Sequence, residues 1–206
     1  MAIGNRESVI TTCNLVLELD EDHMSSLFWF LQSGFVLADV EVGCSLKAFL
    51  TGQLGMTPEF IRECISTIFL DGKPVDDLDT ATVHDGSRLA LSSAMPGLVG
   101  ATMRRGGVLA SLRSSITYKD EGARKGGKGS VNVKLFNMVM TDAGPRLLQE
   151  GILVSCSDFE SFMQDNAALF EACRSISLNG MSISAGELKS LVPPGGFISL
   201  SVKRKA

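Results

Sequence analysis

The chain has 206 residues, of which 45% are hydrophobic and 20% are charged, so its composition is that of a globular protein and excludes a disordered one. Its formal net charge of -4 speaks against nucleic acid as a partner. The five cysteines form no C-x-x-C pair, which removes the usual zinc and iron–sulfur spacings, and we expect no metal and no other cofactor.

The N-terminal residues lack the basic stretch followed by an apolar stretch that defines a signal peptide. The longest apolar block, residues 27–31, is far shorter than the roughly 20 residues that cross a bilayer. We therefore expect a cytoplasmic protein without a membrane partner.

Charge is distributed unevenly along the chain. Residues 1–97 hold 5 basic and 14 acidic side chains, a net charge of -9. Residues 98–130, called the connector below, hold 7 basic and 2 acidic side chains, a net charge of +5. This asymmetry predicts either that the connector lies against the acidic part of the chain or that it binds an anion.

The first part of the chain predicts alternating strands and helices. Apolar residues at every second position indicate strands, and Gly34 marks the end of a helical piece. Thr57 before Pro58 is typical of a new helix start. The expected elements are a strand over 13–19, a helical piece over 24–32, a strand over 35–42, a helix over 45–65 that breaks at 57–58, and strands on either side of turns at 71–72 and 85–86.

The last part of the chain predicts the same order of elements. We expect a strand over 131–140, a helical piece over 143–149 that Gly151 ends, a strand over 152–154, and a main helix from Ser157 or Asp158. The segment Ile176–Gly180 (ISLNG) then matches Ile68–Gly72 (IFLDG) at an offset of 108, because Asn-Gly and Asp-Gly form the same kind of turn.

Upstream blocks align in the same order, which indicates a tandem duplication. LQSGFVL at 31–37 matches LQEGILV at 148–154, and Cys44-Ser45 matches Cys156-Ser157. We predict three parts, which are a first copy over 1–97, a basic glycine-rich connector over 98–130, and a second copy over 131–206.

Each copy, read as strand, strand, helix, strand, strand, resembles the β-grasp or ubiquitin-like fold. The segments LDGKPV and DGSRLALSSAMPG, between Leu70 and Gly97, are similar to the sulfur-carrier branch, which includes the small molybdopterin-synthase subunit and the thiamine sulfur carrier. The resemblance implies an α+β protein of two tandem β-grasp units, each a mixed sheet packed on one main helix.

The same resemblance suggests a candidate carrier tail. Sulfur carriers end in a diglycine, but here Gly97 is followed by Leu98, and a diglycine occurs only later as Gly106-Gly107. Chemistry of that kind would require proteolysis after Gly107. The competing interpretation is that the two glycines form a joint between the copies.

The connector also contains candidate anion-binding residues. They are Arg104, Arg105, Lys125 and Lys128. The segment GARKGGKGS at 122–130 nearly spells a phosphate-binding loop, but Gly129 stands where a Ser or Thr would hold magnesium, and a strand is expected to follow where a helix should begin.

Three functions follow, in order of preference. The first is a non-catalytic binding or assembly module that contacts a protein partner or a second copy of itself. The second is a sulfur-carrier-like precursor that is processed near Gly107. The third is a phosphate-ligand-binding protein or an enzyme that uses the connector, although the sequence offers no set of acid, base and nucleophile.

Overall fold

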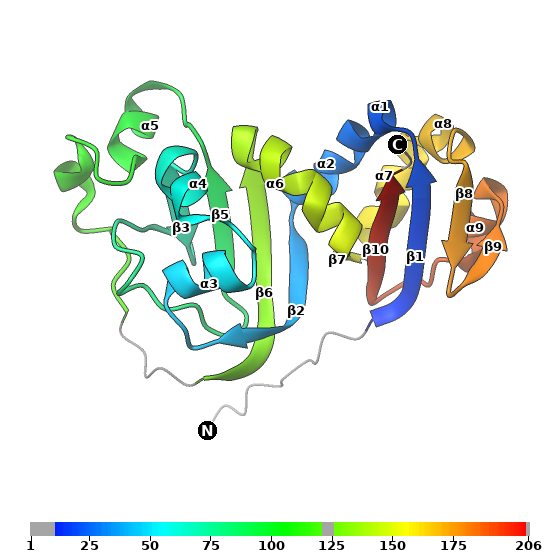
Figure 1. Cartoon of the computed structure of the whole chain (residues 1–206), viewed down its shortest axis with the longest axis horizontal. Helices are drawn as coiled ribbons and strands as arrows, with labels where there is room; N and C mark the ends of the chain where they lie inside the picture. The colour runs from blue at the N-terminus through cyan, green and yellow to red at the C-terminus, as the bar shows by residue number, and fades with distance from the viewer. Residues whose placement is uncertain (1–10, 121–125, 205–206) are drawn as a thin grey trace. The chain divides into compact units, whose positions relative to one another are not determined.

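The computed structural model describes residues 11–120 and 126–204 and shows an α+β protein with mixed β-sheet structure (Figure 1). The chain divides into two compact units. Unit 1 takes both ends of the chain, up to Ser26 and from Leu148 onward, and unit 2 runs from Leu27 to Leu147. These boundaries differ from those of the predicted copies.

Unit 2 contains a five-stranded sheet in the order β4-β3-β5-β6-β2. Its strands are β2 (Phe35–Val42), β3 (Thr67–Leu70), β4 (Lys73–Pro74), β5 (Arg88–Ser92) and β6 (Gly127–Phe136). Its helices are α2 (Phe28–Ser33), α3 (Leu46–Gly52), α4 (Pro58–Glu63), α5 (Gly97–Met103) and the 3₁₀ helix η2 (Ala110–Arg113). β6 is parallel to β5 and antiparallel to β2.

Unit 1 contains a five-stranded sheet in the order β7-β10-β1-β8-β9. Its strands are β1 (Thr11–Leu19), β7 (Ile152–Ser155), β8 (Ser175–Leu178), β9 (Met181–Ile183) and β10 (Phe197–Arg204). Its helices are α1 (Glu21–Met24), α7 (Cys156–Asp165), α8 (Ala167–Glu171) and α9 (Ala185–Leu191). β1 is parallel to β10 and antiparallel to β8.

The first strand of each predicted copy therefore lies in the sheet of the other copy. β1, from the first copy, pairs with β10 and β8, which belong to the second. β6, which opens the second copy, pairs with β2 and β5 from the first. Figure 1 shows this exchange by colour, since blue β1 lies beside red β10 and yellow-green β6 lies beside blue β2.

Both exchanged strands have the alternation that places one face in a core. In β1, the side chains of Cys13, Leu15, Leu17 and Leu19 are buried. In β6, the buried side chains are Val131, Val133 and Leu135, while Asn132 and Lys134 between them are exposed. The period of two thus predicts the strands correctly, but it carries no information about which sheet they join.

A helical passage follows each exchanged strand. After β1, residues 21–33 are helical throughout, as α1, the 3₁₀ helix η1 (Ser25–Leu27) and α2, and the chain passes from unit 1 to unit 2 within η1. After β6, α6 (Asn137–Glu150) carries the chain back and includes Pro145. Gly34 and Gly151 follow the two passages at φ +125° and +103°, so both predicted helix stops are confirmed.

The strand predicted over 131–140 is wrong at its end, because β6 stops at Phe136 and α6 begins at Asn137. Asn137 has φ +55°, a left-handed conformation that Asn tolerates, and its side-chain amide donates to the Ser92 hydroxyl and the Ala94 carbonyl. These bonds fix the bend from strand to helix, and an alternating apolar pattern gives no sign of them.

Other local predictions are confirmed. Asp71-Gly72 and Asn179-Gly180 both adopt the paired positive φ values of a type I′ turn. Thr57 caps α4, with its hydroxyl accepting from the Phe60 N–H at 3.2 Å. None of the helices in the described ranges has the length and apolar character that crossing a bilayer requires.

Candidate functional site

The first two thirds of the connector fold against the rest of unit 2 and do not form a solvated linker. α5 and η2 contact each other, and the backbone of the segment bonds to unit 2 at two places. The Arg105 N–H donates to the Ser66 carbonyl at 2.7 Å, and the Tyr118 N–H donates to the Pro74 carbonyl at 2.8 Å. The prediction that the connector lies against the acidic part of the chain is confirmed for these residues.

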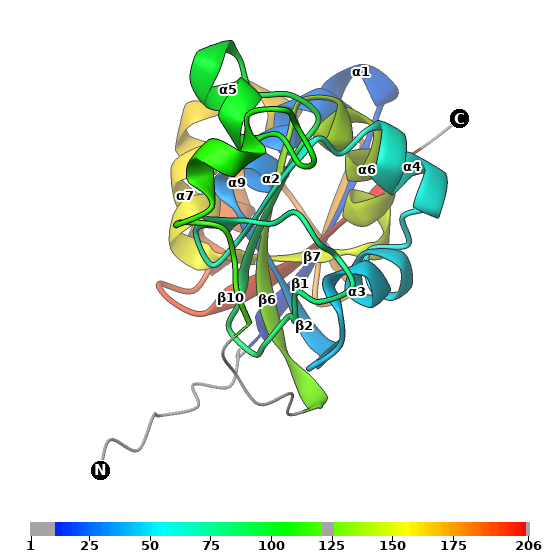
Figure 2. The same cartoon turned by 90° about the vertical axis from the view of Figure 1, so that its left-hand side faces the viewer.

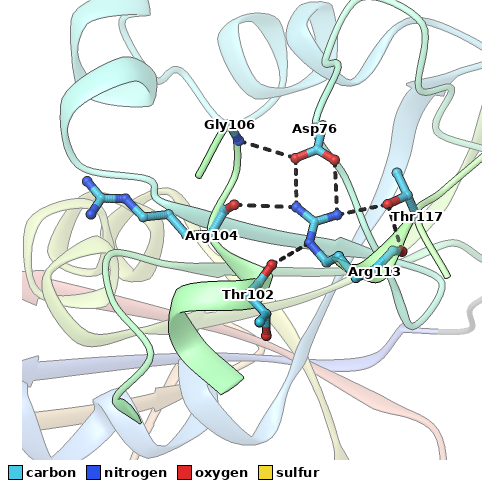
Figure 3. A network of polar contacts seen from close by, with 6 residues as sticks. All are labelled: Asp76, Thr102, Arg104, Gly106, Arg113 and Thr117. Atoms are coloured by element: carbon cyan, nitrogen blue, oxygen red, sulfur yellow. Dashed lines mark hydrogen bonds and ion pairs between the residues drawn. The ribbon is translucent and has the colours of Figure 1, made fainter. Parts of the chain in front are cut away.

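The centre of this arrangement is the buried guanidinium of Arg113, whose side chain is only 3% exposed (Figure 3). It forms a two-pronged ion pair with Asp76, at 2.6 Å from Nη2 to Oδ1 and 3.0 Å from Nη1 to Oδ2. The remaining acceptors are the Thr102 carbonyl at 2.7 Å, the Thr117 hydroxyl at 2.9 Å and the Arg104 carbonyl at 3.4 Å.

An arginine side chain carries five N–H donors, and each of the five has an acceptor here. A buried charge is tolerated only when it is paired and hydrogen-bonded in this way. Arg113 therefore joins α5, η2 and the end of the segment to Asp76 and holds residues 98–118 in one conformation.

The diglycine lies inside the same network. Gly106 has φ +61°, and its N–H donates to Asp76 Oδ1 at 3.2 Å (Figure 3). The Gly107 N–H donates to the Arg104 carbonyl at 3.2 Å, and a Cβ on Gly107 would come within 3.2 Å of the same oxygen. Both glycines thus have a structural reason in the turn between α5 and η2.

The candidate anion-binding residues do not converge. Arg105 is half-buried and donates from Nη2 to the carbonyls of Ile61 and Ile65, and burial lowers the pKa of its guanidinium while the charge of Asp76 opposes that shift. Lys128 donates from Nζ to the Asp39 carbonyl at 2.9 Å. Arg104 is exposed, and its side chain points away from Arg113 (Figure 3).

Lys128 stands near the start of β6, at the opposite end of unit 2 from α5 in both views (Figures 1 and 2). Lys125, the fourth predicted cation, lies outside the described residues, as do residues 122–125 of the segment that resembles a phosphate-binding loop. Within the described residues, the predicted anion site is therefore not assembled.

The anchored segment carries an unusual number of exposed apolar side chains. Five of the nine large exposed hydrophobic residues that the structure describes lie between residues 98 and 116. They are Leu98 (73% exposed), Val99 (62%), Val108 (95%), Leu112 (72%) and Ile116 (48%). Exposed apolar side chains concentrated in one segment make that segment a candidate interaction surface.

α5 packs closely against the backbone that precedes it. A Cβ added to Gly100, which is buried, would lie 1.8 Å from the Met95 carbonyl oxygen. No side chain fits at that position, so the backbone of α5 at Gly100 lies directly against the backbone at Met95. The exposed Leu98 and Val99 are therefore presented from a fixed helix, with the buried Arg113 network on its far end.

A cavity of about 450 Å³ adjoins the network and is lined by residues 75–77, 80–81 and 117–120. Asp76 and Thr117 belong to both the cavity and the Arg113 network. On the cavity wall, backbone N–H donation from Asp79 holds the pKa of Asp77 below its ordinary value, and burial raises the pKa of Tyr118, whose hydroxyl donates to the Thr82 carbonyl.

Among the described residues, no group of three or more His, Cys, Asp or Glu side chains is placed to hold a metal ion. Burial disfavours the thiolate form of three cysteines, since it raises the pKa values of Cys13 and Cys44 and raises that of Cys173 to about 11.

Sequence reasoning missed the residues that organise this region, Asp76, Arg113 and Tyr118. In the sequence, Asp76 is one of 14 acidic side chains in residues 1–97, and Arg113 is one of seven basic side chains in the connector. The opposite charges of residues 1–97 and the connector could have indicated an ion pair between them. A buried arginine needs a carboxylate partner, so such a pair would join a connector arginine to an acidic residue of the first segment.

Searches with this chain against protein-family models, curated proteins and solved structures found no match.

Proposed function

We propose that this protein is a non-catalytic binding or assembly module that engages a protein partner through residues 98–116. The observation that carries the proposal is that one segment combines a buried hydrogen-bond network with exposed apolar side chains. Arg113 is buried with five satisfied donors, while five large apolar side chains of the same segment face solvent. A segment that served only as a spacer would need neither feature.

The proposal includes the finer assignment of the fold, two β-grasp-like units derived from a duplication. Its support is the common order of elements in the two copies, a strand, a helical passage, a strand, two short helices and then further strands. Two features depart from a simple tandem arrangement. They are the helical passages at 21–33 and 137–150 and the exchange of β1 and β6.

The test compares two triple variants of the full chain, each expressed in its native cells. The first, Val108→Ser/Leu112→Ser/Ile116→Ser, removes apolar side chains from the segment. The matched control, Met138→Ser/Met181→Ser/Leu191→Ser, removes the same number of exposed apolar side chains elsewhere. All six positions are exposed, so we expect each triple variant to fold as the wild type does.

We expect a protein that co-purifies with the wild-type chain to remain with the control variant and to be lost from the segment variant. Retention of the same partner by both variants would reject residues 98–116 as the binding surface. Equal loss from both variants would point to nonspecific apolar adsorption and would equally reject the proposal.

The second candidate, a carrier precursor cut after Gly107, is favoured by one observation. Val108, the residue directly after the diglycine, is 95% exposed, so the bond between them is within reach of a protease. Intact mass of the protein from its native cells tests this function. A species ending at Gly107, with sulfur in place of one carboxylate oxygen, would establish it, and a single full-length species would remove it.

The third candidate, a phosphate-ligand site on the connector, draws less support. Arg105 and Lys128 donate to backbone carbonyls, which leaves Arg104 as the described candidate for which no such bond is observed, although Lys128 is also exposed. Arg104→Ala should abolish retention on immobilised phosphate if such a site operates.

A further inference from the structure

β1 has a particular place in unit 1. It lies between β10 and β8, and it is the strand through which these two are joined in the sheet order. The remaining strands of unit 1 all follow residue 148, so β1 reaches this sheet from the other end of the chain. Without β1 the sheet of unit 1 is divided into β7-β10 on one side and β8-β9 on the other.

The contacts that hold β1 in unit 1 involve the strand itself and not the helical passage that follows it. β10 pairs with β1 in parallel register from Thr11 to Leu19, and β8 pairs with Leu15 to Glu18 in antiparallel register. Leu15, Leu17 and Leu19 are fully buried below the sheet. These backbone bonds and apolar contacts are the same whichever copy of the chain supplies the strand.

The chain that leaves β1 contains a weak point at the unit boundary. Residues 21–33 form one helical run, but its centre, η1, is a 3₁₀ stretch, and the passage between units falls between Ser26 and Leu27 inside it. Neither N-cap side chain, that of Asp20 for α1 or of Leu27 for α2, accepts a hydrogen bond from its own helix, and the Asp20 carboxylate pairs instead with Arg174 at 2.7 Å. A 3₁₀ interruption within a helix often marks a hinge.

The corresponding passage after β6 is built differently. α6 is a single α-helix of 14 residues without a 3₁₀ interruption. The ends of both strands are held in their own sheets, β6 by the bonds of Asn137 to Ser92 and Ala94 and β1 by the ion pair of Asp20 with Arg174, so the passages differ in the 3₁₀ stretch. Of the two exchanged strands, β1 is therefore the one whose tether can turn toward another molecule.

We propose that β1 is exchanged between two copies of this chain, so that each copy completes unit 1 of its partner. The occupant of the surface formed by β10 and β8 is thus a second copy of residues 11–19. Exchange of an identical element is a low-cost route to a dimer, because every contact of the monomer is retained. This dimer uses no side chain of the proposed binding segment, so it stands or falls independently of that function.

The experiment co-expresses two full-length chains with different tags, one carrying Val16→Cys and the other Ser201→Cys. Val16 and Ser201 are partners in the β1–β10 register, and both are half-buried. Neighbouring strands lie about 4.8 Å apart, within the range that a disulfide spans. Neither chain can form this bond by itself, since each holds only one of the two new cysteines.

We expect double-tag purification followed by oxidation to give a disulfide between position 16 of one chain and position 201 of the other, identified by peptide mass spectrometry. The control pairs Val16→Cys with Ser157→Cys, an exposed position at the start of α7, and should give no such link. Because five native cysteines are present, the identity of the linked peptides, and not dimer formation by itself, is the readout.

The wild-type chain provides a second measurement without any substitution. Chains with two different tags, co-expressed, should give a mixed dimer by native mass spectrometry if β1 is exchanged. Three results would each overturn the proposal. The first is a chain that stays monomeric at every concentration, and the second is a mixed dimer without the link between positions 16 and 201. The third is an equal link in the control pair.

Discussion

The two units build similar sheets from differently arranged stretches of chain. Unit 2 runs without interruption from Leu27 to Leu147, whereas unit 1 brings both ends of the chain together. The strand from the other copy lies between β2 and β5 in unit 2, but between β10 and β8 in unit 1. Closing unit 1 therefore requires contacts between residues more than 150 positions apart, with the loop-closure entropy that such a distance costs.

The units differ also in what they carry. Unit 2 anchors residues 98–118 through the buried pair of Arg113 and Asp76. Unit 1 instead inserts α9 between β9 and β10, where the first copy has an irregular segment between β4 and β5. Under the two proposals above, unit 2 holds the interaction surface and unit 1 holds the exchangeable strand, and three predictions test that division.

The largest effect is expected from Asp76→Ala. Arg113 would remain buried without its carboxylate, and removing one partner of a buried ion pair costs about 3–5 kcal/mol of unfolding free energy. Trp29, in α2 of unit 2, gives the signal in urea unfolding. Arg104→Ala is the matched control, since this exposed side chain should change stability by no more than about 0.5 kcal/mol. Equal stability of the two variants would contradict the anchoring role of Arg113.

The second prediction separates the units by their exchanged strands. Leu17→Ala in β1 and Leu135→Ala in β6 each create a cavity at a fully buried position and should cost about 2–5 kcal/mol. Leu135→Ala should move the Trp29 fluorescence transition to lower urea. Leu17→Ala should move a transition in far-ultraviolet circular dichroism and leave the Trp29 signal in place. Coincident shifts of both signals in both variants would mean that the units unfold together.

The smallest effect is expected at α9. Ser184 and Glu187 form a reciprocal capping box, so Ser184→Ala should cost about 0.5–2 kcal/mol. The Ser184 side-chain hydrogen bond holds the pKa of Glu187 below its ordinary value. Because the pKa of Glu187 is lower in the folded state than in the unfolded state, its ionised form stabilises the fold above the unfolded-state pKa. This stabilisation is lost as the pH falls through the folded-state pKa.

Amide exchange of α9, followed from neutral pH downward, measures this dependence. We expect α9 in the wild type to lose protection in acid, and α9 in Ser184→Ala to be less protected already at neutral pH. α4 provides the comparison in unit 2, because Thr57 caps it without a carboxylate at the third helical position. An acid-induced loss in α4 as large as that in α9 would contradict the assignment to Glu187.

Much of the local structure follows from the sequence. The period-two pattern of Cys13 to Leu19, the Asp-Gly and Asn-Gly turns, the cap at Thr57 and the helix stops at Gly34 and Gly151 all depend on residues close together in the chain. The charge difference between residues 1–97 and the connector left two interpretations, contact between the two or an anion site, and the contact is observed for residues 98–118.

The tertiary structure alone decided where the strands go and which charges pair. An alternating strand fits equally well beside any complementary edge, so nothing within Cys13 to Leu19 specifies β10 and β8 as its neighbours. Arg104, Arg105 and Arg113 are similar in the sequence, but one faces solvent, one bonds to carbonyls and one is buried on Asp76. That difference arises from desolvation and from partners distant in the chain, which a local pattern cannot contain.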